Sequence, residues 1–174
     1  MKKVIYVIVA IVLLVILSCE KDTTTPDNNP VLMGLNGLVQ KGPFITGSTI
    51  EIQELNDNLS PNGISFNVST EDNFGSFTLE SEISTDFIEI ISTGFYFNEV
   101  SGEVTNTNLT LRAISPVESS VKCNINILTT LAKKRIVYLV NEENNTYTEA
   151  KQQAQGEILS IFNITASDSI DFEK

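Results

Sequence analysis

The residue types that carry most enzyme chemistry are scarce in this sequence. The chain of 174 residues has no histidine and only two cysteines, Cys19 and Cys123. The lack of histidine removes the commonest general base, the usual partner of a nucleophilic serine or cysteine, and the commonest zinc ligand. Glycoside hydrolysis needs two carboxylates, and Glu89, Glu99 and Glu103 are acidic candidates, but their spacing singles out no pair. We therefore expect a protein that is not an enzyme and needs no cofactor or metal.

The charge balance argues against another class of function. The chain carries 22 acidic residues against 11 Lys and Arg, which gives a formal net charge of −11. From Val31 to Val121 the only basic residues are Lys41 and Arg112. A surface of this kind repels phosphate groups. We therefore expect no nucleic-acid partner.

The first residues change character at Cys19. A basic start, Lys2 and Lys3, precedes the apolar run Val4–Leu17, which is followed by Ser18 and Cys19. At 1.5 Å per residue the 14 residues of this run span roughly 21 Å, which is less than the ~30 Å of a bilayer core. The length and charge are typical of an export signal rather than a permanent membrane helix.

The end of this run, Ile16-Leu17-Ser18-Cys19, resembles the lipobox of bacterial lipoprotein signal peptides. In that family a diacylglycerol is attached to the cysteine, the leader is cut just before it, and the new amino terminus is acylated, with palmitate among the acyl groups. The resemblance implies a signal peptide at residues 1–18, a lipid-modified Cys19 and a location in the cell envelope as an outer-membrane lipoprotein. An uncleaved single-span anchor is the alternative.

Residues 19–30 contain two prolines and no apolar residue after the cysteine, which predicts a flexible tether. The charged stretch Glu20-Lys21-Asp22 resembles the export tags of surface-displayed lipoproteins in some Gram-negative bacteria, so a surface-exposed position is expected, with the periplasmic face as the alternative. Short triplets that begin at Asp22 and Asp168 resemble acceptors of bacterial O-glycosylation. That resemblance implies glycans on Thr23 and Ser169.

The body between residues 31 and 117 has the pattern of a β-sandwich. Short runs of β-branched and aromatic residues alternate there with Gly, Pro, Asn and Asp. In the stretch STIEIQEL, Ile50 and Ile52 alternate with polar residues, so one face is expected to be buried. The stretch DFIEIIS is apolar on both faces, which predicts a central strand. The predicted strands are 37–40, 49–55, 64–69, 76–80, 87–92, 94–100 and 109–114. In EDNFGSF, Asp72 and Asn73 are expected to close a turn before Gly75, and a calcium site at Glu71, Asp72 and Asn73 is the alternative.

Three stretches of the body resemble one known module. The stretches GLVQKGPFITGSTIEI, FNVSTEDNFGSFTL and IEIISTGF are similar to the carboxypeptidase regulatory-like, transthyretin-related β-sandwich, over roughly residues 34–115. The resemblance implies a seven-stranded Greek-key sandwich of Ig or transthyretin type. It also implies a non-catalytic role as a spacer, stabiliser or binding module of exported proteins.

Past Pro116 the apolar period changes to three and four residues, which predicts a helix over 126–141. Thr146 and Glu149 form a capping box before a second apolar stripe, so an antiparallel helical hairpin is expected over 122–165. This part resembles the helical segment that follows such sandwiches in uncharacterised bacterial surface lipoproteins. Cys123 is expected to be a buried small residue, and residues 166–174 an acidic tail.

The function expected from these features is that of a non-enzymatic, lipid-anchored envelope lipoprotein that acts as a spacer, display or binding module. Its membrane contact is expected through the lipid anchor, and its partner is expected to be a surface polysaccharide or a protein. One alternative is a fimbrial or adhesin-like subunit, because exported sandwiches polymerise through open strand edges. Another is polysaccharide binding through Phe95, Tyr96 and Phe97, although strand alternation buries at least one of these rings.

Overall fold

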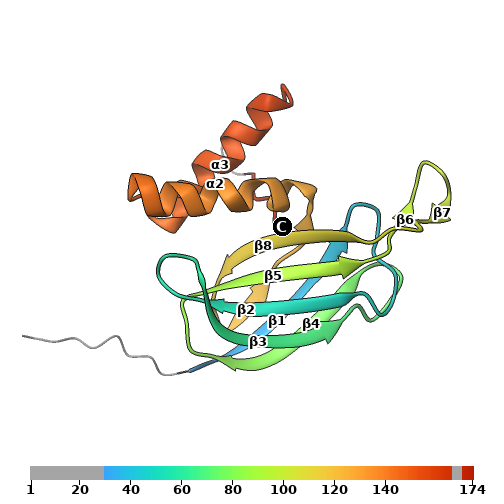
Figure 1. The fold of residues 1–174 in the computed structure, drawn as a ribbon, viewed down its shortest axis with the longest axis horizontal. Coiled ribbons are helices and arrows are strands. Elements are labelled where there is room, and N and C mark those ends of the chain that lie inside the picture. Colours follow the sequence, from blue (N-terminus) through green and yellow to red (C-terminus); the bar gives the residue numbers. More distant parts are fainter. Residues whose placement is uncertain (1–29, 166–169) are drawn as a thin grey trace, which may run out of the picture.

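A computed structural model describes residues 30–165 and 170–174 of the chain (Figure 1). The predicted signal peptide, nearly all of the predicted tether, and the modification sites Cys19, Thr23 and Ser169 lie outside the described residues. Within the described part, no helix combines the length and apolar character needed to cross a membrane. The described chain is mainly β, with two helices toward its C-terminal end.

The strands and helices follow one another along the chain with short connections. Their bounds are β1 (Val31–Gln40), β2 (Thr49–Leu55), β3 (Pro61–Ser69), β4 (Ser76–Ile83), β5 (Phe87–Gly94), β6 (Phe97–Asn98), β7 (Glu103–Val104), β8 (Leu109–Pro116), β9 (Ser120–Lys122), β10 (Ile125–Asn126), α2 (Ile127–Glu143) and α3 (Tyr147–Ile161).

Two four-stranded sheets form the body of the molecule. The first has the order β10-β1-β4, and β9 also pairs with β1; the second has the order β3-β2-β5-β8. The paired strands are antiparallel, except that β9 and β10 run parallel to β1. Strands β6 and β7 form a separate two-stranded hairpin that projects from one end of the body (Figure 1).

The main hydrophobic core lies between the two sheets. Met33 and Leu35 of β1 meet Ile50 and Ile52 of β2 there, each of them 0–1% exposed. The burial of Ile50 and Ile52 confirms the predicted alternation in β2. Strand β5 lies between β2 and β8, which confirms that it is an inner strand of its sheet. Alternate residues of β5 therefore point to opposite layers, both of which are covered.

The helices cover the outer face of the second sheet and form a second core there (Figure 1). Ala132, Ile136 and Leu139 of α2 pack with Ala150, Ala154 and Ile158 of α3 and with Leu55 and Ile114 of the sheet. The apolar period predicted the first helix, and the capping box of Thr146 and Glu149 is confirmed at the start of α3. Asn126 and Thr129 form a second capping box, which starts α2.

One predicted strand is wrong, and three short strands were missed, namely β7, β9 and β10. Residues 94–100 do not form a single strand, because β5 continues to Gly94 and the chain turns there. Phe95 then pairs with the loop before β2, where Ile45 N–H donates to Phe95 O at 3.1 Å. Strands β9 and β10 follow residue 117 and belong to the first sheet. The sheets therefore extend into the part of the chain for which only helices were predicted.

Candidate functional site

Four loops gather at one end of the two sheets, and we call this region the loop end. It comprises residues 41–48, 70–75, 94–97 and 105–108, which connect strand ends that are paired in register, such as Thr49 with Ser69 and Gly94 with Leu109. Strand β1 reaches the loop end at Gln40 and begins at Val31, at the opposite end of the body. The loop end therefore lies far from the start of β1.

Backbone hydrogen bonds hold the loops of the loop end to one another. Loop 41–48 is the centre of these contacts, because it bonds to each of the 70–75 and 94–97 loops. The bonds are Ile45 N–H to Phe95 O (3.1 Å), Phe97 N–H to Pro43 O (2.9 Å), Gly47 N–H to Thr70 O (3.0 Å) and Thr46 N–H to Asn73 Oδ1 (3.0 Å). Satisfied backbone groups of this kind make a loop a fixed platform for side chains.

The aromatic triplet Phe95-Tyr96-Phe97 divides between core and surface. Tyr96 turns inward and stacks on Phe44, with ring centroids 6.1 Å apart, and Lys41 Nζ lies 5.2 Å from its ring. Phe95 and Phe97 on either side are each 38% exposed. Tyr96 is the most buried of the three rings and packs against the core between the sheets, but it is only half-buried, so the predicted burial is confirmed in part. The exposed rings are Phe95 and Phe97.

A groove of about 240 Å³ lies beside Phe95 in the loop end. Its lining is uncharged and rich in hydroxyl groups, and consists of residues 45–49, Thr93, Gly94, Phe95 and Asn108. The Ser48, Thr49 and Thr93 hydroxyls each have a bond within the protein, but a hydroxyl oxygen keeps further acceptor capacity. The Asn108 side chain is exposed and adds an amide donor and acceptor. Such a lining suits a neutral ligand with many hydroxyl groups and one apolar face.

The acidic residues are not brought together for hydrolysis. Glu89 is 2% exposed and lies beneath α2, where Arg112 Nη1 is 2.8 Å and Lys133 Nζ 3.3 Å from its carboxylate oxygens. Glu99 and Glu103 are exposed near the β6–β7 hairpin, away from the middle of β5. Glu89 therefore joins a helix to a sheet, and the three acids form no pair.

Asp72 closes the predicted turn. Its Oδ1 accepts hydrogen bonds from Phe74 N–H at 2.9 Å and Ser76 N–H at 3.0 Å, which confirms the turn before Gly75. The bond from the Ser76 backbone holds the pKa of Asp72 below its usual value. Glu71 binds the Thr78 hydroxyl and Asn73 binds Thr46, so the three side chains proposed for calcium bond to different partners. Among the described residues, no group of three His, Cys, Asp or Glu is placed to hold a metal ion.

Cys123 is buried, as predicted, and burial raises the pKa of its thiol. A thiol that stays protonated is a poor nucleophile.

Sequence reasoning missed two residues of the loop end. They are Phe74, which is 72% exposed in the turn after Asp72, and Asn108 of the groove. An apolar ring within a polar turn was the available signal for Phe74.

No family model, no curated protein and no solved structure matches the chain.

Proposed function

We propose that the protein is a lipid-anchored module of the cell envelope that presents a binding surface and catalyses no reaction. The observation that carries this proposal is the run Ile16-Leu17-Ser18-Cys19 with a polar stretch after it, which fits a lipid-modified Cys19 on an outer-membrane lipoprotein. The described body supports it. Strand β1 has 10 residues and spans roughly 33 Å, so an anchor before Val31 turns the loop end away from the membrane.

The finer fold is part of the same proposal. We infer a Greek-key sandwich of the carboxypeptidase regulatory-like type followed by an antiparallel helical hairpin. Support comes from the pairing of β1 with β4, because the two strands between them along the chain lie in the opposite sheet. The contact of Arg135 in α2 with Glu157 in α3 fits antiparallel helices joined by a short loop.

Mass spectrometry of the full chain from the membrane fraction tests the anchor. For the parent chain, we expect an amino-terminal Cys19 that carries acyl groups. For the Cys19→Ser variant, we expect that the leader is not removed. Thr23→Ser is the matched control, because it changes one hydroxyl residue of the tether and should leave acylation intact. Protease added to intact cells then separates the surface from the periplasmic face. An unmodified Cys19 in the membrane fraction contradicts the proposal.

The groove beside Phe95 favours a neutral surface polysaccharide as the ligand of this module. Stacking of a sugar ring on Phe95 would place its hydroxyl groups near Asn108 and the threonines of the groove, while charged groups are absent from the lining. On a glycan array we expect Phe95→Ala to weaken binding roughly threefold to tenfold. Leu32→Ala is the control, because Leu32 is 67% exposed near the start of β1, at the end of the body opposite the loop end. Equal binding by both variants and the parent chain sinks the assignment of the ligand to this groove.

A further inference from the structure

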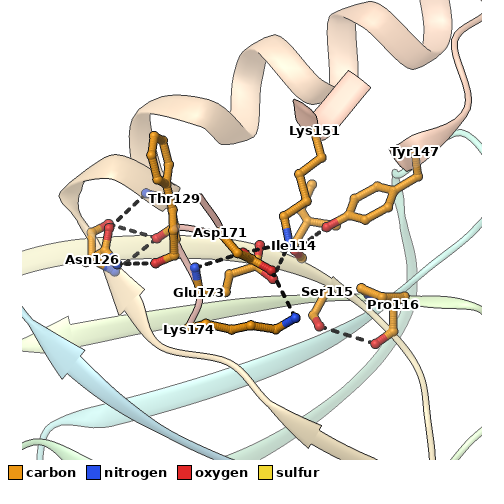
Figure 2. A network of polar contacts seen from close by, with 11 residues as sticks. Ile114, Ser115, Pro116, Asn126, Thr129, Tyr147, Lys151, Asp171, Glu173 and Lys174 are labelled. Atoms are coloured by element: carbon orange, nitrogen blue, oxygen red, sulfur yellow. Dashed lines mark hydrogen bonds and ion pairs between the residues drawn. The ribbon is translucent and has the colours of Figure 1, made fainter. Parts of the chain in front are cut away.

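Residues 170–174 lie against the body, and we call them the strap. Within this segment Phe172 is 5% and Glu173 7% exposed, although the sequence predicted an acidic tail. Figure 2 shows Asp171, Glu173 and Lys174 between Lys151 of α3 and Asn126 at the start of α2. The strap therefore occupies a site formed by parts of the chain that are distant from it in sequence.

The strap site contacts both the charges and the aromatic ring of the strap. Lys151 Nζ lies 3.0 Å from an Asp171 oxygen and 2.8 Å from a Glu173 oxygen. The Phe172 ring between these two acids packs into the core formed by the helices and the second sheet. The site therefore suits a segment with an acid, an aromatic residue and an acid in sequence.

The strap site also binds the backbone of the strap. Asn126 Nδ2 donates to Phe172 O at 2.7 Å, and Asn124 N–H donates to Glu173 O at 2.9 Å (Figure 2 shows Asn126). The Gln155 amide, oriented to satisfy both of its groups, donates to Ile170 O at 2.9 Å and accepts from Phe172 N–H at 3.2 Å. Side-chain pockets combined with backbone hydrogen bonds are how proteins recognise short extended peptides.

Residues 162–169, which connect α3 to the strap, are long enough for the strap to lie against a second molecule. The eight residues 162–169 separate the end of α3 from Ile170, and eight extended residues reach about 26 Å. The helix between Gln155 and Ile161 rises only about 9 Å. The connection is therefore long enough for the strap to reach a neighbouring molecule while α3 stays folded.

An apolar patch lies at the origin of this connection. Ile161, Phe162 and Ile164 are 74%, 53% and 49% exposed, and the end of α3 extends away from the sheets (Figure 1). If two molecules exchange their straps, both connections start at these residues, so the two patches approach each other. The exchange would remove from water the apolar side chains that a single copy exposes.

We propose that the strap is an exchangeable recognition element, and that residues 170–174 of one copy bind the strap site of a second copy. The contacts in the exchanged pair are the same as those within one chain, so exchange costs little contact energy and forms a closed two-fold pair. The inference goes beyond the proposed function and does not depend on the ligand of the loop end.

Cross-linking between full-length chains with two different tags tests the exchange. One chain carries Gln152→Cys and the other Ile170→Cys, because both positions line one groove of about 840 Å³ beside the strap. A short bifunctional maleimide should join the two chains roughly tenfold more than in the control, since a seated strap holds the thiols at a high effective concentration. The control replaces Gln152→Cys with Gln153→Cys, an exposed neighbour that does not line the groove.

Two further chains make the result decisive. A chain with both Gln152→Cys and Ile170→Cys should cross-link within itself and thereby report a strap bound in its own site. Adding Phe162→Ser and Ile164→Ser should lower the cross-link between chains severalfold and keep the internal one, because both side chains are exposed in one copy. Internal cross-linking alone overturns the exchange, as does the absence of both products or a product with a different protein.

Discussion

Lys151 lies between two carboxylates whose pKa values move in opposite directions. Burial raises the pKa of Glu173, and the nearby ammonium only partly offsets this effect. Burial also acts to raise the pKa of Asp171, but hydrogen bonds from Glu173 N–H and Lys151 outweigh it and lower the pKa. The pKa of Lys151 itself is raised, because its carboxylate partners outweigh its burial. The folded state therefore favours the charged forms of Lys151 and Asp171 and disfavours the charged form of Glu173.

Glu173→Gln should change how stability depends on pH. The folded state holds the Glu173 proton more tightly than the unfolded state, whose pKa is near 4.5, so ionisation of Glu173 lowers stability as pH rises above that value. The neutral amide lacks this loss. We therefore expect the variant to become more stable relative to the parent chain as pH rises from 4.5. Urea unfolding at several pH values measures the two unfolding free energies. A pH-independent difference contradicts this expectation.

Glu157→Gln should show the opposite slope. Hydrogen bonds from Arg135 at 2.7 and 2.8 Å lower the pKa of Glu157 to about 2. Its contribution is therefore present above pH 4.5 and is lost as pH falls toward about 2. Because the Arg135–Glu157 pair is largely exposed, we expect the variant to lose less than about 1 kcal/mol of unfolding free energy at neutral pH. In the same urea series, the unfolding free energies of variant and parent should converge as the pH falls. A difference that grows at low pH counts against a stabilising role of the Glu157 charge.

At the scale of elements, local patterns predicted what local contacts determine. Strand β2 has its predicted bounds of Thr49 and Leu55, because the alternation of apolar and polar residues within it matches its two faces. The cap of α3 depends on Thr146 and Glu149, three residues apart, and it was also predicted. In both cases the determining residues are neighbours in sequence.

The elements that were missed depend on distant partners. Strand β10 is two residues long, too short for a period, and it is a strand because Ile125 pairs with Val39 of β1. Phe95 leaves the predicted strand because its carbonyl accepts a bond from Ile45. The strap looks like a solvated acidic tail until Lys151 is placed beside it. No pattern within these segments encodes those partners.

Gly37→Ala should separate β1 from the segment between β9 and β10. A Cβ atom at position 37 would lie 2.0 Å from the Cys123 carbonyl oxygen, which is backbone and cannot rotate away. We expect a loss of about 1–3 kcal/mol in unfolding free energy, as for overpacked cores. The control is Gly34→Ala in the same strand, where the nearest atom is 3.7 Å away, so no such loss is expected. Equal urea midpoints for the two variants contradict this account.

At the scale of the whole molecule, the second sheet is shared by two cores. Ile88 and Ile90 of β5 face the core between the sheets, whereas Phe87 packs with the helices on the other face. Ile114 of β8 likewise joins the sheet to α2 and α3. The core between the sheets contains no residue of α2 or α3, but it includes Val121, Cys123 and Ile125, which follow residue 117.

A fragment of residues 30–117 should therefore fail to fold cooperatively. Ending the chain there removes β9 and β10 from β1 and uncovers Leu55 and Ile114, which are 1–2% exposed in the complete body. We expect aggregation or the loss of near-ultraviolet circular dichroism, with a broad thermal transition. Residues 30–174 are the control and should melt in one transition. A fragment with the same melting temperature as the control shows that the sheets are an independent domain.

The pairing of β1 has a consequence for the time at which the chain folds. Val39 pairs with Ile125, a separation of 125 − 39 = 86 residues, so β1 is synthesised long before its parallel partner. At about 5–20 residues per second, the ribosome needs roughly 4–17 s to supply that partner. Pairing over such a separation is also intrinsically slow. During this interval β1 has only its antiparallel partner β4, so the first sheet stays incomplete until residues 120–126 have been synthesised.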